Sequence, residues 1–176
     1  KVRFHWDRLD KMSDKSSCWV RVASGWAGDG FGAIMTPRVG MEVLVTFLDG
    51  DPDRPLINGC LPNARHLPPY PLPQHKTRSV LRSRSSPGGA GANELHLEDR
   101  LGKELIYLRA QRDLQQQVGH DCHLEVGGER RETIRGLSTV YLENEEHRDV
   151  RGSRKVLIGA GDHLQVKGDS QAYIGQ

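Results

Sequence analysis

The most regular feature of the chain is an eight-residue spacing of aliphatic side chains through its last third. In eight successive blocks that begin at Arg112, the seventh residue is always Val, Ile or Leu. These residues are Val118, Val126, Ile134, Leu142, Val150, Ile158, Val166 and Ile174. The fifth residue is apolar in five blocks, at Leu124, Val140, Val156, Leu164 and Ala172. Positions five and seven share one side of an extended strand, and eight residues fit no heptad or helical repeat, so the spacing predicts β-structure.

Glycine marks the boundaries between these blocks. It occupies the eighth or the first position at Gly119, Gly127, Gly128, Gly136, Gly152, Gly159, Gly168 and Gly175. Glycine tolerates the positive φ that a sharp corner between strands often requires. We therefore expect each block to form a short strand followed by a corner, with positive φ at the glycine.

A strand of this kind buries only about two side chains on one face, which does not offset the entropy lost by ordering eight residues. Three identical chains wound around one axis remove this deficit, because neighbouring strands pair and the inward side chains meet. The pattern therefore predicts a trimeric β-helix, roughly 40 Å long if each block climbs about 4.8 Å. Its predicted core consists of Val118, Leu124, Val126, Ile134, Val140, Leu142, Val150, Val156, Ile158, Leu164, Val166 and Ile174. A single-chain β-solenoid and an evenly spaced meander of hairpins remain open as alternatives.

Three inward positions are polar in the first half of the repeat. Gln116, Glu132 and Arg148 occupy position five in every second block. In a threefold assembly each of them becomes an axial ring of three like groups. Because burying such groups unpaired is costly, we expect water or ions in this stretch and interpret the rings as solvated features.

The first 61 residues predict a different β-domain. Alternation of apolar and polar residues indicates strands at Lys1–Trp6, Ser17–Ala23 and Val39–Leu48, and Pro55–Cys60 gives a short fourth strand. Several short strands without a helical stretch favour a small barrel, and the five-stranded OB type fits the size if its first strand lies upstream.

Residues 62–92 are rich in Pro, Arg, Ser and Gly and are predicted to be a linker. Composition leaves two interpretations open: a flexible connector, or an ordered strap that crosses to a neighbouring subunit with its arginines on carboxylates. Residues 93–176 then form a hairpin entrance and the β-helix. The block that starts at Glu104 also obeys the eight-residue rule, with Leu108 and Ala110 at positions five and seven.

Composition narrows the classes of function. The chain has 25 basic and 23 acidic residues, a net charge of +2, which gives no case for nucleic-acid binding. Three scattered cysteines without a CxxC motif suit a reducing compartment, and no apolar run reaches membrane-spanning length. No catalytic motif of the HExxH or GxSxG type occurs, and His120 and His123 fall at a corner and on the outer face, where solvated histidines are typical. We expect no enzymatic activity, cofactor or metal.

Two further motifs are interpreted as turns. Gly28–Gly32 has the spacing of a phosphate-binding loop, but no helix is predicted after it, so a tight loop is expected. Asp49, Asp51 and Asp53 have calcium-like spacing but lack the closing glutamate, and Pro52 interrupts them. A solvated turn is the expected structure there.

Several short segments, in order along the chain, carry a resemblance to a known family. They are Val2–Asp7, Ser17–Val22, Pro37–Gly40, Gly50–Pro55, Thr77–Ser79, Ser85–Gly89 and Asn93–Leu95. The chain resembles the VgrG spike proteins of type VI secretion, which are similar to the cell-puncturing device of contractile-tail phages. The resemblance implies an OB-fold neck below a triple-stranded β-helix in a homotrimer. Four positions depart from the family's usual Val-Gly block ending, so its corner geometry does not carry over directly to Arg135, Glu143, Arg151 and Lys167.

The resemblance also implies a function. Family members sit on the Hcp tube, carry a PAAR-repeat protein at the tip and effector proteins as cargo, and pierce target membranes when the sheath contracts. We therefore expect a structural spike that is assembled in the bacterial cytoplasm and secreted into target cells. A phage tail spike or baseplate hub is an alternative, as is a carrier of an enzymatic effector domain beyond Gln176. The start at Lys1 and the absence of the family's upstream hub domains suggest a part of a longer protein.

Overall fold

The chain is an all-β protein. The computed structural model describes residues 1–9 and 13–172. Among them it has six strands and one short 3₁₀ turn, and none of its helices is long and apolar enough to cross a membrane. The chain divides into one unit from Lys1 to Val118 and a second from Gly119 onward.

A three-stranded sheet organises the N-terminal region. It consists of β1 (Arg21–Val22), β2 (Glu42–Phe47) and β3 (Pro55–Leu61) in the order β1-β3-β2. β2 and β3 are antiparallel with an irregularity between Leu44 and Val45, and β1 runs parallel to β3. The predicted alternation in β2 is confirmed, because its odd-numbered residues are partly buried while Leu44 and Thr46 are exposed. Ile57 of β3, which lies opposite Val45 in the register, is buried.

The tight turns predicted in this region are also confirmed. β2 leads into a 3₁₀ turn at Leu48–Gly50, in which Asp49 has a φ of 54° and pairs with Arg54 at 2.6 Å. In the Gly28–Gly32 loop, the Gly28 amide donates to the Phe31 carbonyl at 2.9 Å.

The strand predicted at Lys1–Trp6 is wrong. This segment pairs with no strand among the described residues, and a turn forms at its end in which the Asp7 amide donates to the Phe4 carbonyl at 3.2 Å. Phe4 instead stacks on Trp6 and on Phe47, with ring centroids 4.6 and 6.1 Å apart. In the predicted strand Ser17–Ala23, only Arg21–Val22 pairs. Alternation indicates a face to bury, but an edge with free hydrogen bonds is also needed to make a strand.

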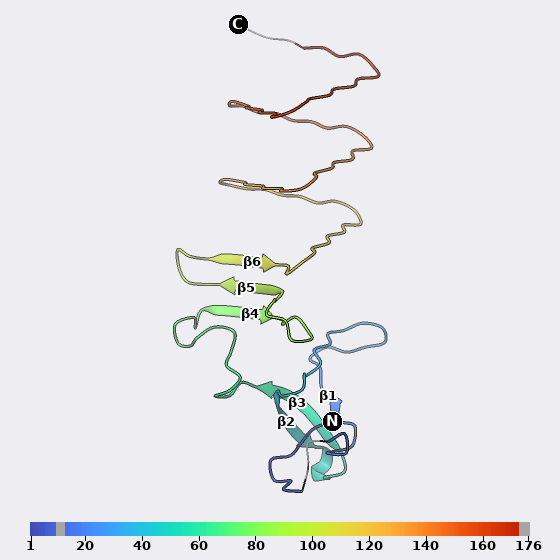
Figure 1. Ribbon diagram of the computed structural model, residues 1–176, viewed down its shortest axis with the longest axis vertical. Coiled ribbons are helices and arrows are strands. Elements are labelled where there is room, and N and C mark those ends of the chain that lie inside the picture. The colour runs from blue at the N-terminus through green and yellow to red at the C-terminus, as the bar shows by residue number, and fades with distance from the viewer. Residues whose placement is uncertain (10–12, 173–176) are drawn as a thin grey trace. The chain divides into compact units, whose positions relative to one another are not determined.

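The segment predicted as a linker, residues 62–92, contains a strand that was not predicted. β4 (Arg78–Arg82) pairs antiparallel with β5 (Glu94–Glu98), which pairs with β6 (Leu105–Arg109). Arginine and serine dominate β4 and conceal its strand character, which comes from the partner strand and not from local preference. Figure 1 shows the three strands stacked as a ladder.

The C-terminal unit has the predicted corners. Its backbone bends at residues 119–120, 127–128, 135–136, 143–144, 151–152, 159–160 and 167–168, with a spacing of eight. No residue between 110 and 172 pairs with another strand of the same chain, and Figure 1 accordingly draws no arrows there. A single-chain solenoid, whose successive coils are hydrogen bonded, does not have this arrangement.

The expectation of positive φ at these corners is wrong. Every described glycine with positive φ lies at or before Gly102. A Cβ added at Gly127 or Gly152 would meet no atom within 4 Å in the isolated chain. The bend at Arg135 and at Glu143 is therefore made without the conformation that only glycine adopts readily. This explains how the corner at residues 143–144 forms without any glycine, and how Arg135, Arg151 and Lys167 replace glycine at position eight while the repeat stays intact.

Candidate trimerisation surface

One face of the β4-β5-β6 sheet is apolar and uncovered. The register places Leu81 beside Leu95 and Leu95 beside Leu108, while Leu97 lies beside Ile106. All five side chains are between 40% and 74% exposed. A contiguous apolar face of this kind is typical of an interface with another chain. This face is absent from the core predicted from the sequence, although the alternation at Leu95 and Leu97 was a signal for it.

The opposite face of the same sheet is polar and buried, which reverses the usual arrangement. Glu94, His96 and Glu98 of β5 are only 5%, 5% and 7% exposed. Residues 67–77, from the segment predicted as a linker, cover them. The Tyr70 hydroxyl donates to Glu94 Oε1 at 2.5 Å, and Thr77 donates to Glu98. We call residues 67–77 the strap.

Hydrogen bonds and ion pairs satisfy most of this buried cluster. His96 Nδ1 lies 2.6 Å from Glu94 Oε1, and its ring stacks on Tyr107 at 4.7 Å. Arg82 pairs with Glu94 at 3.4 Å, and Arg78 pairs with Glu98 at 3.3 Å. Of the two interpretations of the linker, the ordered strap agrees with these contacts between arginines and carboxylates. The strap was expected to cross to a neighbouring subunit, whereas these contacts lie within one chain.

The cluster shifts the pKa of three of its members. The hydrogen bond from Tyr70 is the largest cause that lowers the pKa of Glu94, and the hydrogen bond from Thr77 does the same for Glu98. The hydrogen bond to Glu94, together with burial, raises the pKa of Tyr70. The cluster therefore favours ionised glutamates and a neutral tyrosine.

These shifts predict how stability depends on pH. A lowered carboxyl pKa stabilises the fold above the ordinary value of 4.5, and the stabilisation is lost as the pH falls through the lowered pKa. A raised tyrosine pKa stabilises the fold below 10.0, and this is lost as the pH rises through the raised pKa. We expect the melting temperature to be flat from about pH 5 to 9 and to fall on both sides. In Tyr70→Phe the alkaline fall shrinks; an unchanged alkaline limb would contradict the assignment.

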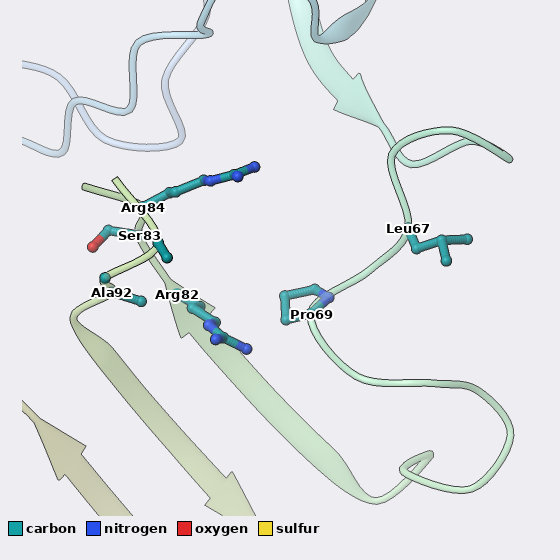
Figure 2. A pocket seen from close by; sticks show the side chains of 8 residues that line it. Leu67, Pro69, Arg82, Ser83, Arg84 and Ala92 are labelled. Carbon is teal, nitrogen blue, oxygen red and sulfur yellow. The ribbon is translucent and has the colours of Figure 1, made fainter. Parts of the chain in front are cut away.

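A shallow cavity of about 360 Å³ lies beside the strap. Its lining consists of Leu67, Pro69, Arg82, Ser83, Arg84, Ala90, Gly91 and Ala92. Figure 2 shows Leu67 and Pro69 on one side and Arg82, Ser83 and Arg84 on the other. The buried residues Glu94 and His96 do not line this cavity.

In the C-terminal unit, the side chains of the predicted core differ with their position in the repeat: those at position five, Leu124, Val140, Val156 and Leu164, are between 59% and 81% exposed, and those at position seven are less exposed. At position seven the exposed fraction of the side chain ranges from 45% at Val126, the lowest, to 56% at Leu142, the highest. Apolar side chains of the other phases, such as Tyr141 and Leu157, are 91% and 87% exposed. Every described residue from Gln111 to Ala172 is exposed in the single chain. Ile174 lies outside the described residues, and the inward orientation of the row stays a prediction.

Two of the three side chains predicted to form axial rings, Glu132 and Arg148, have partners that were not predicted from the sequence. Arg130 donates to Glu132 at 3.0 Å, and Arg148 donates to Glu146 at 2.8 Å. In both blocks the partner is the residue at position three, on the same side of the strand as position five. Within one chain, Glu132 and Arg148 are therefore each paired with an opposite charge, and the rings themselves stay a prediction. Inspection of position three was the signal that could have revealed this.

The remaining candidates do not converge on a site. His120 pairs with Asp121 at 3.0 Å on an open surface, with its side chain 91% exposed. The described residues contain no group of three or more His, Cys, Asp or Glu side chains arranged to hold a metal.

Comparisons with known proteins agree with this architecture. Residues 79–176 match the bacteriophage T4 gp5 C-terminal trimerisation domain, and residues 1–61 match the type VI secretion system/phage-baseplate injector OB domain. The first match starts within β4, so the trimerisation domain includes the ladder of β4, β5 and β6 as well as the repeats.

Curated relatives of the chain are VgrG proteins. The chain is 58% identical over 78% of its length to the type VI secretion system spike protein VgrG4b of Pseudomonas aeruginosa, and 54% identical over 78% to VgrG5 of the same organism. It is 46% identical over 84% of its length to the actin cross-linking toxin VgrG1 of Vibrio cholerae. The chain spans less than a fifth of these relatives, at 17%, 18% and 14% of their lengths. An OB domain followed by a trimerisation domain, with this similarity across most of the chain, shows that the chain belongs to the VgrG spike proteins of the type VI secretion system.

Proposed function

We propose that three copies of this chain form a stiff spike that pierces the membrane of a target cell during type VI secretion. The observation that carries the proposal is the unpaired state of residues 110–172, which present a half-exposed aliphatic row and no strand pairing of their own. Pairing with two neighbouring copies satisfies both needs at once, because their strands supply the hydrogen bonds and their side chains close the core.

In this proposal the axis is lined by the residues predicted from the sequence. They are Val118, Leu124, Val126, Ile134, Val140, Leu142, Val150, Val156, Ile158, Leu164, Val166 and Ile174, with polar layers at Gln116, Glu132 and Arg148. We add the sheet face of Leu81, Leu95, Leu97, Ile106 and Leu108 as a second apolar surface for contact between copies. The paired residues Arg130 and Glu146 neutralise two of the polar layers.

The remaining roles follow from the same proposal. The spike rests on the Hcp tube, bears a PAAR-repeat protein at its tip, is assembled in the bacterial cytoplasm and is delivered with effectors into the target cell. The chain itself is the shaft and neck and performs no catalysis. One relative is named an actin cross-linking toxin, which supports the second candidate function: a carrier of an effector domain attached to the full-length protein.

The proposal is tested in the full-length protein. Val126→Asp, placed on the axis, is expected to abolish Hcp release and killing of competitor bacteria, whereas Glu125→Gln in the opposite phase retains both. Secreted Hcp is measured in culture supernatants, and killing is measured by survival of a susceptible strain. Secretion that persists with Val126→Asp would contradict the role of this axis in the spike.

A further inference from the structure

An apolar arm in the N-terminal unit has no role in the architecture described so far. It comprises residues 24–39 and contains the Gly28–Gly32 loop. Its large apolar side chains are strongly exposed: Trp26, Phe31, Ile34, Met35 and Val39 are 65%, 61%, 90%, 69% and 106% exposed. Asp29 and Arg38 are its only charged residues. Its composition suits contact with another protein surface. It is not typical of a segment that binds a polyanion or of a solvated loop.

The arm is an ordered hairpin although its side chains are uncovered. The Ala33 amide donates to the Trp26 carbonyl at 2.9 Å, and the Ser24 hydroxyl donates to the Ala33 carbonyl at 2.6 Å. Trp26 and Phe31 meet edge to face with centroids 6.0 Å apart. At Gly32 the φ is +138°, and a Cβ would come within 2.5 Å of the Trp26 carbonyl oxygen. A preformed apolar surface loses little entropy when it binds.

The base of the arm is attached next to the trimerisation surface. Arg38 Nη1 donates to the Arg84 carbonyl at 2.5 Å. Arg84 lies two residues beyond the end of β4, and β4 contributes Leu81 to the apolar sheet face. Both segments belong to the same unit of the chain. The base of the arm is therefore bonded to the chain just beyond the strand that contributes Leu81 to the apolar sheet face.

We propose that the arm of each subunit docks on the adjacent subunit of the trimer and closes a ring of three identical contacts around the neck. A threefold axis brings every arm to the same surface of the next copy. The contact is therefore heterologous, and three such contacts close the ring. The inference rests on the trimer but goes beyond the spike proposal, because it assigns the arm and not the β-helix.

A photo-crosslinking amino acid placed at Ile34 tests the contact. We expect irradiation of the purified chain to give species of two and three chains on denaturing gels, with the crosslinks mapped by mass spectrometry to the neighbouring copy. The same amino acid at Val126 verifies that the preparation is trimeric. Efficient links from Val126 with only single-chain species from Ile34 would overturn the arm contact and leave the spike standing. Absence of links from both positions, with a monomer mass in solution, would overturn both.

A pair of substitutions gives a second readout. Ile34→Asp is expected to raise the concentration at which the trimer dissociates at least tenfold. Leu101→Asp is the matched control, because Leu101 is 93% exposed in the turn between β5 and β6. Dissociation is followed by light scattering in a dilution series. Equal dissociation of the two variants would count against the arm, and a selective effect of Ile34→Asp supports it.

Discussion

Ile158→Asp is expected to convert the trimer into monomers. The unmodified chain should have about three times its single-chain mass of 19.7 kDa. Loss of one buried aliphatic side chain costs about 1.5–3 kcal/mol per chain, and three copies multiply the loss. Three carboxylates brought together on a dry axis add a larger desolvation and repulsion penalty. Light scattering coupled to gel filtration measures the mass.

Leu157→Asp is the matched control for this substitution. Leu157 is the adjacent residue in the opposite phase, and it is 87% exposed while Ile158 is 46% exposed. The control chain should keep the trimer mass because its new carboxylate lies in solvent. If Ile158→Asp remained a trimer, position seven would not face the axis. If Leu157→Asp were then monomeric, position six would be the inward position.

Glu94→Ala is expected to have the second largest effect. The substitution leaves the Tyr70 hydroxyl, His96 Nδ1 and Arg82 without their shared acceptor beneath the strap. Buried donors without partners, and a charge without its counterion, destabilise the fold by about 3 kcal/mol or more in sum. Denaturant unfolding at one fixed chain concentration measures the loss. The stability of Glu94→Gln should lie between that of the unmodified chain and that of Glu94→Ala, because its amide oxygen still accepts a hydrogen bond from Tyr70.

Glu104→Ala is the control for the buried cluster. Glu104 is exposed and lies beside β6, where its removal uncovers no buried group. Its effect should stay within about 0.5 kcal/mol. If Glu94→Ala is as stable as Glu104→Ala, the polar face of β5 does not hold the strap.

Local patterns revealed the repeat but did not reveal the N-terminal pairings. Lys1–Trp6 alternates as clearly as β2 does, yet only β2 has a partner strand, β3, which follows it after the turn. β4 has a poor strand composition and pairs fully. Strand formation in both cases depends on a partner distant in the sequence, which no local pattern reports.

The candidate surface shows the same division. The aliphatic row at position seven was visible as a spacing, because each side chain must recur once per turn of the repeat. The buried face of Glu94, His96 and Glu98 was not visible, because polar residues in a strand are typical of an exposed face. Only the strap, brought over them by the fold, makes these residues interior.

The sequence by itself determined the eight-residue period, the all-β class, the aliphatic row and the family. Each of these is written in the spacing or order of residues along the chain. The tertiary structure alone decided which face of β5 is covered, that the strap is ordered, that Glu132 and Arg148 have partners at position three, and that the corners need no positive φ. These features depend on distances between groups and on backbone angles, which spacing along a chain does not fix.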